Sequence, residues 1–213
     1  MMAFLKQENG YIFRIVHREN FPLVLSGGLF AKNARGSDPR YVNIGNLDLI
    51  DRRGRRAVPI DPRGVLNDYV PFYFTPYSPM ALNINTGYNG IVKRPNDDIL
   101  ILVSTINHAI DSGLNIIFTD RHAYLATANF YREAHQLDQI DWEALRAKDF
   151  RKDPRNPERV ERYQAEALIH EHVPLTGLKG IAVHNDHVGA VVQKHVDKSG
   201  TTLQVRTMPS WYF

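Results

Sequence analysis

The chain has 213 residues, of which 43% are hydrophobic and 23% charged, proportions that exclude a wholly disordered chain and favour one globular domain. It contains no cysteine, which excludes disulfides, thiolate catalysis and cysteine-ligated zinc and favours a cytoplasmic location. No stretch has the ~20 apolar residues of a membrane-spanning helix, and the N-terminus lacks a secretion signal. The net charge is only +3, so overall charge says little about partners.

Periodicity in the first half of the chain is irregular. Alternation over Tyr11–His17 predicts a strand, and Asn20–Leu25, which is followed by two glycines, predicts a short helix. Residues 30–62 are rich in glycine, proline, arginine and asparagine, and we expect a long irregular loop there. Aromatic residues over Tyr69–Phe74 predict a strand. Pro71 within it indicates an edge strand, or one that begins at the proline.

The second half of the chain alternates short strands and helices. Apolar runs predict strands at Ile99–Ser104, Asn115–Thr119, Ile181–His184 and Thr202–Arg206. Helical spacing predicts helices at Thr105–Ser112, Ala123–His135, Asp141–Ala147 and Asp186–Val196. Gln164–His170 fits a helix or a strand, and we favour a strand with Glu166 on its less apolar face. Because no regular βαβ rhythm is visible, this order predicts an α+β fold.

Two local compositions point to chemistry. Arginines crowd residues 51–63, and the segment DYVPFYFTPYSPM at residues 68–80 is dense in aromatic rings. Arginine forks bind phosphate and aromatic faces stack on bases, although a solvated loop and a core strand are the simpler interpretations. His170 and His172 would share one face of a strand, but no third ligand accompanies them, and we expect no metal site.

A series of ordered strings resembles one known family. The strings are IVHREN (15–20), NIGN (43–46) leading to DRR (51–53), DYVPFYFTPYSPM (68–80), ILVS (101–104), FTDRHAY (118–124), LDQIDW (137–142), ERYQAEALI (161–169) and the terminal WYF (211–213). Each string alone is weak evidence. As a series that spans nearly the whole chain, they resemble the DarT-type DNA ADP-ribosyltransferase toxins.

This resemblance implies an ADP-ribosyltransferase fold of two packed, mostly antiparallel sheets with flanking helices, in a single domain over residues 1–213. It implies an enzyme that consumes NAD as co-substrate, needs no metal, and attaches ADP-ribose to a base, typically thymidine, in a short sequence context of single-stranded DNA, releasing nicotinamide. The implied partners are single-stranded DNA and a DarG-like macrodomain antitoxin, and no membrane is involved.

The resemblance also implies catalytic residues at matching positions. Glu166 matches the catalytic glutamate, which grips a ribose hydroxyl of NAD and stabilises the positive charge that develops as the nicotinamide bond breaks. Arg53 matches an arginine that holds the NAD phosphates and assists proton removal from the attacking base. His122 matches a position near the target nucleotide, where it either hydrogen-bonds DNA or orients Glu166. A core histidine satisfied by backbone groups is the competing interpretation.

Binding residues follow from the same matches. The stretch that holds the nicotinamide and its ribose corresponds to Arg14, Ile15, Val16, Asn20 and Leu23, with Phe30 beyond it. Many relatives have a histidine where this chain has Arg14. The wall that meets the target base corresponds to Tyr73, Tyr77 and Met80, and relatives often carry arginine at the position of Tyr77. Residues from about 33 to 54 are expected to close over NAD, and residues 118–166 to include the loop that selects the substrate.

Two other functions fit the residues. The first keeps the NAD chemistry but transfers ADP-ribose to guanosine, RNA or protein, because loop residues choose the acceptor. The second is a non-catalytic module that binds single-stranded nucleic acid through the aromatic strand and the arginine loop. Glu166 argues against this module, since a carboxylate in a DNA groove repels phosphate.

Overall fold

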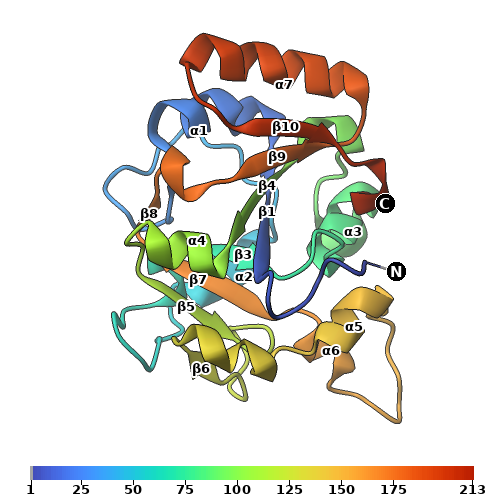
Figure 1. Ribbon diagram of the computed structural model, residues 1–213. Helices are drawn as coiled ribbons and strands as arrows, with labels where there is room; N and C mark the ends of the chain where they lie inside the picture. The colour runs from blue at the N-terminus through green and yellow to red at the C-terminus, as the bar shows by residue number, and fades with distance from the viewer. Residues whose placement is uncertain (1) are drawn as a thin grey trace.

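The computed structural model describes residues 2–213. Its centre is an eight-stranded sheet with the strand order β10-β9-β4-β1-β3-β7-β5-β6, beside a two-stranded sheet of β2 and β8 (Figure 1). The strands are β1 (Tyr11–His17), β2 (Leu29–Phe30), β3 (Tyr69–Tyr73), β4 (Ile99–Thr105), β5 (Ile116–Thr119), β6 (Phe130–Tyr131), β7 (Glu166–His170), β8 (His172–Val173), β9 (Gly180–Val183) and β10 (Gln204–Thr207). Only β9 and β10 pair in parallel, so the predicted α+β class is confirmed.

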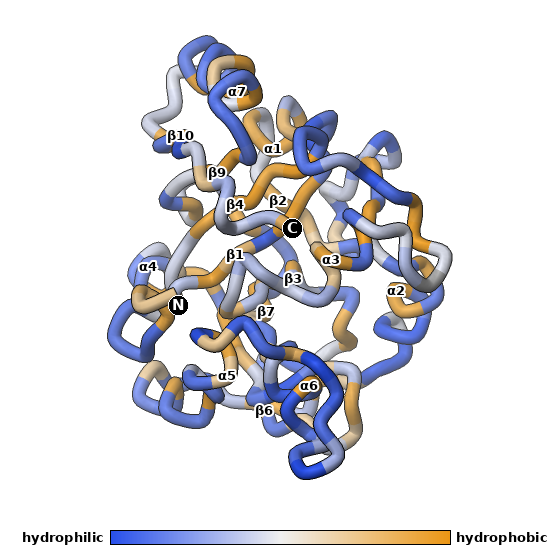
Figure 2. The backbone as a smooth tube through the Cα atoms, turned by 90° about the vertical axis from the view of Figure 1, so that its right-hand side faces the viewer, coloured by the Kyte–Doolittle hydropathy of each residue, from blue (hydrophilic) through white to orange (hydrophobic). Residues whose placement is uncertain are grey.

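Seven α-helices accompany the sheet in the described residues. They are α1 (Phe21–Gly27), α2 (Leu47–Arg53), α3 (Pro79–Thr86), α4 (Ile106–Asp111), α5 (Trp142–Ala147), α6 (Arg159–Arg162) and α7 (Asp186–Ser199). Figure 1 shows α1 and α7 together at one end and α5 and α6 at the other. Helix α7 buries Val188, Val192 and Val196, which recur every four residues along one face. Its other faces are polar, whereas strands β4 and β9 are mainly apolar (Figure 2).

Strands β1 and β3 are joined by a single residue pair, Phe13 with Tyr73. This pair connects the half-sheet β10-β9-β4-β1 to the half-sheet β3-β7-β5-β6, and the strands part beyond it. Strand β3 is therefore interior, and the expectation of an edge strand was wrong. Pro71 is tolerated because its position faces β1 where no ladder forms: its carbonyl oxygen accepts a hydrogen bond from Arg14 Nη1 at 2.8 Å.

The loop expected over residues 30–62 contains a helix, α2. Asn46 caps it by accepting a hydrogen bond from the Leu49 amide at 3.0 Å. Asp48 lies in its first turn and two arginines in its last, an arrangement that favours the helix dipole. This helix carries Arg53, which is buried.

The helix expected over Ala123–His135 is absent, and turns and strand β6 occupy this segment. Asn129 donates from its main-chain and side-chain nitrogens to the Asp120 carboxylate, both at 3.0 Å. Strand β6 pairs with β5, and Tyr131 stacks on Phe118 with 5.7 Å between ring centroids. Tertiary pairing thus overrides the local helix propensity.

The remaining predicted elements agree with the structure. β1 has the predicted bounds, and β4, β5, β9 and β10 lie within a few residues of theirs. Helix α5 begins after Asp141, which caps it by accepting from the Ala144 amide. The strand preferred for residues 164–170 is β7.

Candidate active site

Glu166 lies at the start of β7, directly across from Tyr73 on β3. Its carboxylate is 2% exposed and accepts hydrogen bonds from Arg53 Nη1 at 3.1 and 2.9 Å. The Ala123 amide donates to Oε1 at 3.0 Å. The expectation that Glu166 occupies the more polar face of its strand holds, but that face is roofed by α2 and the His122 loop rather than open to water.

The Glu166 carboxylate stays ionised in this buried place. Burial by itself raises the pKa of Glu166, but the Arg53 guanidinium, the His122 hydrogen bond and the Ala123 amide together lower it from 4.5 to about 2. A permanent negative charge is thus held inside the protein by fixed donors. Such a charge can stabilise a positive charge that develops on a ligand.

Arg53 has a hydrogen-bond donor that its contact with Glu166 does not use. Its exposed fraction is 8%, and only Nη1 is used by Glu166. Its Nη2 atom is buried and has no hydrogen-bond partner within residues 2–213. A buried unpaired donor of a charged group is costly, so an anionic ligand group is the natural partner for this nitrogen.

His122 contacts the same carboxylate. Its Nδ1 atom lies 3.1 Å from Glu166 Oε1 and 3.3 Å from the Tyr124 amide nitrogen, and its own amide donates to the Glu161 carbonyl. The side chain is 18% exposed and lines a cavity. The structure therefore brings His122, Arg53 and Glu166 together, as expected, and His122 contacts Glu166 rather than only the backbone.

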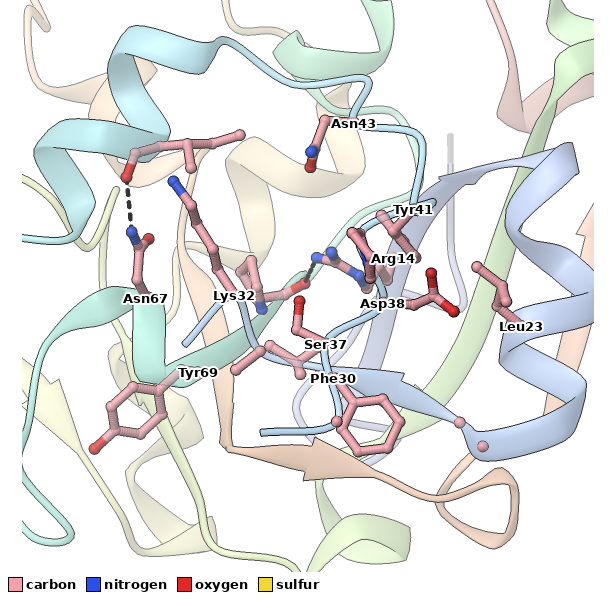
Figure 3. Close-up of a pocket in the computed structure, with 18 of the residues that line it drawn as sticks. Arg14, Leu23, Phe30, Lys32, Ser37, Asp38, Tyr41, Asn43, Asn67 and Tyr69 are labelled. Carbon is pink, nitrogen blue, oxygen red and sulfur yellow. Dashed lines mark hydrogen bonds between the residues drawn. The ribbon is translucent and has the colours of Figure 1, made fainter. Parts of the chain in front are cut away.

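Two adjoining cavities meet at this cluster. The smaller, of about 140 Å³, is lined by Glu166, His122, Tyr73 and Met80 among others. The larger, of about 430 Å³, extends away under the loop that follows β2 (Figure 3), and its volume is typical of a small-molecule site. Six residues line both cavities, namely Arg14, Tyr41, Asn43, Ile50, Arg53 and Pro71. The cavities thus form one cleft, which opens where β1 and β3 part.

The residues expected to bind NAD are distributed unevenly along the cleft. Arg14, Leu23 and Phe30 line the larger cavity, and Ile15 lines the smaller one. Val16 is 1% exposed, belongs to the core and lines neither cavity, so the structure does not place it at the cleft.

Asn20 lines neither cavity, and both its side-chain nitrogen and its side-chain oxygen bond the main chain of Val42. It donates to the Val42 carbonyl at 2.9 Å and accepts from the Val42 amide at 2.7 Å. Its side chain therefore anchors residues 31–46, the loop that roofs the larger cavity.

The residues expected to meet DNA are likewise divided. Tyr73 and Met80 line the smaller cavity, and burial raises the pKa of the Tyr73 hydroxyl, so it stays protonated. Tyr77 is outside both cavities. Its ring stacks on Phe213 with 3.8 Å between centroids, and Lys148 Nζ lies 4.6 Å above it.

Tyr41 and Ile50 lie within residues 33–54, the segment expected to close over NAD, but neither was singled out because they are single side chains in a segment without periodicity. Pro71 was not predicted to line the cleft. Pro71 gave a signal, since a proline inside a strand marks an interrupted ladder.

The histidine pair at residues 170 and 172 serves structural contacts. His172 Nε2 lies 2.6 Å from the Gly27 carbonyl, and its ring stacks on Phe30. Within the described residues, no group of three or more His, Asp or Glu side chains is arranged to hold a metal. No helix in residues 2–213 is long and apolar enough to cross a membrane.

Comparison with known proteins gives a consistent result. The family model described as ssDNA thymidine ADP-ribosyltransferase, DarT, matches residues 13–213. A DNA ADP-ribosyl transferase of Escherichia coli O127:H6 is 44% identical over 211 residues, covering 99% of this chain and 97% of the relative. One of Thermus sp. (strain 2.9) is 38% identical, with 95% of each chain covered.

Solved structures are similar over nearly the full length. Thermus sp. 2.9 DarT in complex with ADP-ribosylated ssDNA has a TM-score of 0.89 at 36% identity, covering 97% of both chains. The same protein in complex with NAD+ has a TM-score of 0.84 at 34% identity, covering 97% of this chain and 98% of the other. The ADP-ribosyltransferase fold is confirmed, and the chain belongs to the DarT family of single-stranded DNA thymidine ADP-ribosyltransferases.

Proposed function

We propose that this cleft transfers ADP-ribose from NAD to a thymidine of single-stranded DNA, with NAD in the larger cavity and the target base in the smaller one. The observation that carries this proposal is the position of the Arg53–Glu166–His122 cluster where the two cavities meet. NAD complexes and ADP-ribosylated DNA are known for the Thermus sp. 2.9 relative, which supports the choice of both substrates.

The ionised Glu166 is proposed to act on the ribose. As the bond between the nicotinamide nitrogen and the anomeric carbon breaks, positive charge develops on the ribose ring. The adjacent carboxylate stabilises that charge without having to reorganise, because Arg53 and the Ala123 amide already fix it. Nicotinamide leaves with the electron pair of the broken bond. A thymine ring nitrogen then forms the new bond to the anomeric carbon and releases its proton to water.

Arg53 is proposed to hold the diphosphate. Its unpartnered Nη2 atom can donate a hydrogen bond to a phosphate oxygen while Nη1 keeps its contact with Glu166. The planar guanidinium fork suits phosphate oxygens. His122 is proposed to orient Glu166 and to contact the target nucleotide. Tyr73 and Met80 form the wall against the base.

Mass spectrometry of a mixed-sequence single-stranded DNA pool incubated with NAD tests this function. We expect a mass gain of one ADP-ribose unit on thymidine with the native chain and none with Glu166→Gln, which keeps the size and most hydrogen bonds of the side chain but removes its charge. The matched control is Glu143→Gln, an exposed glutamate on α5, which should retain full transfer. Full activity of Glu166→Gln, or transfer only to guanosine, RNA or protein, would contradict the proposal.

We also infer that a DarG-like macrodomain antitoxin is the partner of this chain and removes the modification. The support is membership of the DarT family together with the fold shared with Thermosipho africanus DarTG in complex with ADP-ribose. That likeness has a TM-score of 0.75 at 17% identity, and this chain spans 51% of it. Incubating the modified DNA with a macrodomain antitoxin should release ADP-ribose; retention of the modification would contradict the partnership.

Since both substrates, NAD and DNA, are cytoplasmic in bacteria, the cytoplasm is the proposed site of action.

A further inference from the structure

A second groove lies on the same face of the sheet as Glu166. Its volume is about 430 Å³, and β1, β4, β9, β10 and the two chain ends line it. Its floor includes Gly180, which has no side chain, and Ala182, whose side chain is a single methyl group. None of the residues assigned to the catalytic cleft lines it.

The groove is connected to the catalytic glutamate by one row of cross-strand partners. Register pairs run from Glu166 to Tyr73, Phe13, Val103, Gly180 and finally Gln204. Directly paired residues share a face of the sheet, so the groove floor and Glu166 face the same side. Four strand spacings of ~4.8 Å place Gly180 about 19 Å from Glu166 along the sheet.

The aromatic C-terminal segment fills the space between the two sites. Trp211 lines the groove and also a small cavity that it shares with Ile15, while Ile15 lines the catalytic cavity. In Figure 2 the C-terminus lies between the N-terminal segment and α3. The walls of the catalytic cleft and of the groove are therefore continuous.

The chemistry of the groove fits a nucleotide. Three partly exposed aromatic side chains line it, namely Phe4, Tyr11 and Trp211, and the rings of Phe4 and Trp211 stack at 5.4 Å. Lys179 and Arg206 stand at its rim, both exposed. Neither forms a salt bridge with any described residue, and no Asp or Glu is among the lining residues. Stacking rings beside unpaired cations are what single-stranded nucleic acid binds.

We propose that this groove binds a base and its phosphate from the same DNA strand whose thymidine enters the catalytic cleft. The proposal rests on the proposed function for the identity of the strand. At the ~3.4 Å rise of a stacked strand, 19 Å corresponds to no more than about six nucleotides. The groove would thus hold the strand a few nucleotides away from the modified base and contribute affinity rather than chemistry.

The test compares short and long oligonucleotides that carry the same target thymidine. One oligonucleotide has about five nucleotides with the target thymidine at its centre, so that only about two nucleotides lie on either side and the two sites cannot be spanned. Two others, of about 20 nucleotides, extend to the 5′ or the 3′ side. The variant is Lys179→Ala with Arg206→Ala. Its matched control is Lys194→Ala with Lys198→Ala, two exposed lysines on α7, outside the groove.

We expect the Lys179/Arg206 variant to raise KM several-fold for one of the long oligonucleotides and to leave kcat and the KM of the short one unchanged. The slope of log affinity against log salt should shrink by about 1.4, since each single-strand phosphate contact accounts for about 0.7. Binding should also quench Trp211 fluorescence, with Phe substitution of Trp211 as the spectroscopic control. The other tryptophan, Trp142, is buried.

Three outcomes would overturn the proposal. The first is a KM and salt slope equal to those of the α7 control. The second is an equal loss of activity on short and long oligonucleotides, which would indicate a general structural defect. The third is loss of antitoxin binding without any change in DNA binding, which would make the groove a protein interface. Failure of the proposed function itself would appear separately, as native protein that transfers no ADP-ribose to any DNA, while the salt slope would still test the groove.

Discussion

Arg53 donates from its Nη1 atom to both carboxylate oxygens of Glu166, while its Nη2 atom has no hydrogen-bond partner among residues 2–213. The two residues are 113 positions apart in the chain, one at the end of a short helix and the other at the start of a strand. This division of donors lets one side chain fix the Glu166 carboxylate and still bind a ligand anion.

Arg53→Lys should therefore separate charge from geometry. Lysine keeps the positive charge but replaces the rigid planar fork, whose separate nitrogens reach the carboxylate and a phosphate in fixed directions, by one ammonium nitrogen at a different position. We expect kcat/KM for transfer to fall by on the order of 100-fold, the scale of a misplaced positioning group. Steady-state kinetics with NAD and a thymidine-containing oligonucleotide measure this. Arg52→Lys, the exposed neighbour on the same helix, should change kcat/KM little, and an equal effect of both substitutions would refute the assignment.

The depressed pKa of Glu166 makes stability depend on acid pH. The folded-state pKa of about 2 lies below the ordinary value of 4.5, so this carboxylate stabilises the fold fully above pH 4.5. Its contribution, roughly 3 kcal/mol, is lost as pH falls from 4.5 to 2. Urea unfolding at a series of pH values should show this loss in the native chain and lack it in Glu166→Gln. Identical pH profiles for the two proteins would mean that Glu166 is not ionised in the fold.

Asn20→Ala should loosen the roof of the larger cavity. The substitution removes both hydrogen bonds to the Val42 main chain and should cost about 1–3 kcal/mol of stability. Because residues 31–46 line the cavity, we expect KM for NAD to rise and the loop to become sensitive to limited proteolysis. Asn185→Ala, which removes the cap of α7, is the matched control. It should lower stability by about 1 kcal/mol without changing KM for NAD; a similar rise in KM would show a general effect of instability.

Gly36→Ala tests how tightly this loop packs. A Cβ atom at position 36 would overlap the Phe30 ring, and that ring cannot withdraw easily because it is stacked on His172 at 4.3 Å. We expect a lower Tm and a destabilisation of about 1–3 kcal/mol, as for other overpacked sites. Gly45→Ala lies in the same loop, where the nearest atom is 3.7 Å away, and its Tm should not fall. Differential scanning fluorimetry compares the two, and equal Tm values would contradict the close packing.

Local sequence patterns predicted the elements whose stability is mainly local or strongly apolar. In strand β1 apolar and polar residues alternate clearly, and Asp141 is a recognisable N-cap at the start of α5. Helix α2 was missed because its apolar periodicity is short. Its Asn46 cap, early Asp48 and late arginines were visible, however, and could have indicated it.

The site was predicted by resemblance rather than by pattern. No local signal shows that Glu166 is buried, because its counter-charge arrives from α2, far away in the chain. The supposed helix at residues 123–135 fails for a similar reason, since Asp120 and β5 supply its hydrogen bonds instead. Long-range ion pairs and strand-ladder hydrogen bonds determine the structure of these segments. The periodicity of a single sequence carries no information about such long-range contacts.

Near Pro71 no ladder of hydrogen bonds joins β1 and β3, and this bears on aggregation. An unpaired strand edge attracts other chains and promotes aggregation when it lies on the outside of a protein. In this fold an unpaired edge lies between β1 and β3, beneath residues 31–46, where no second polypeptide can add a strand. The protein thereby keeps this strand edge open to a small ligand while hiding it from its own copies.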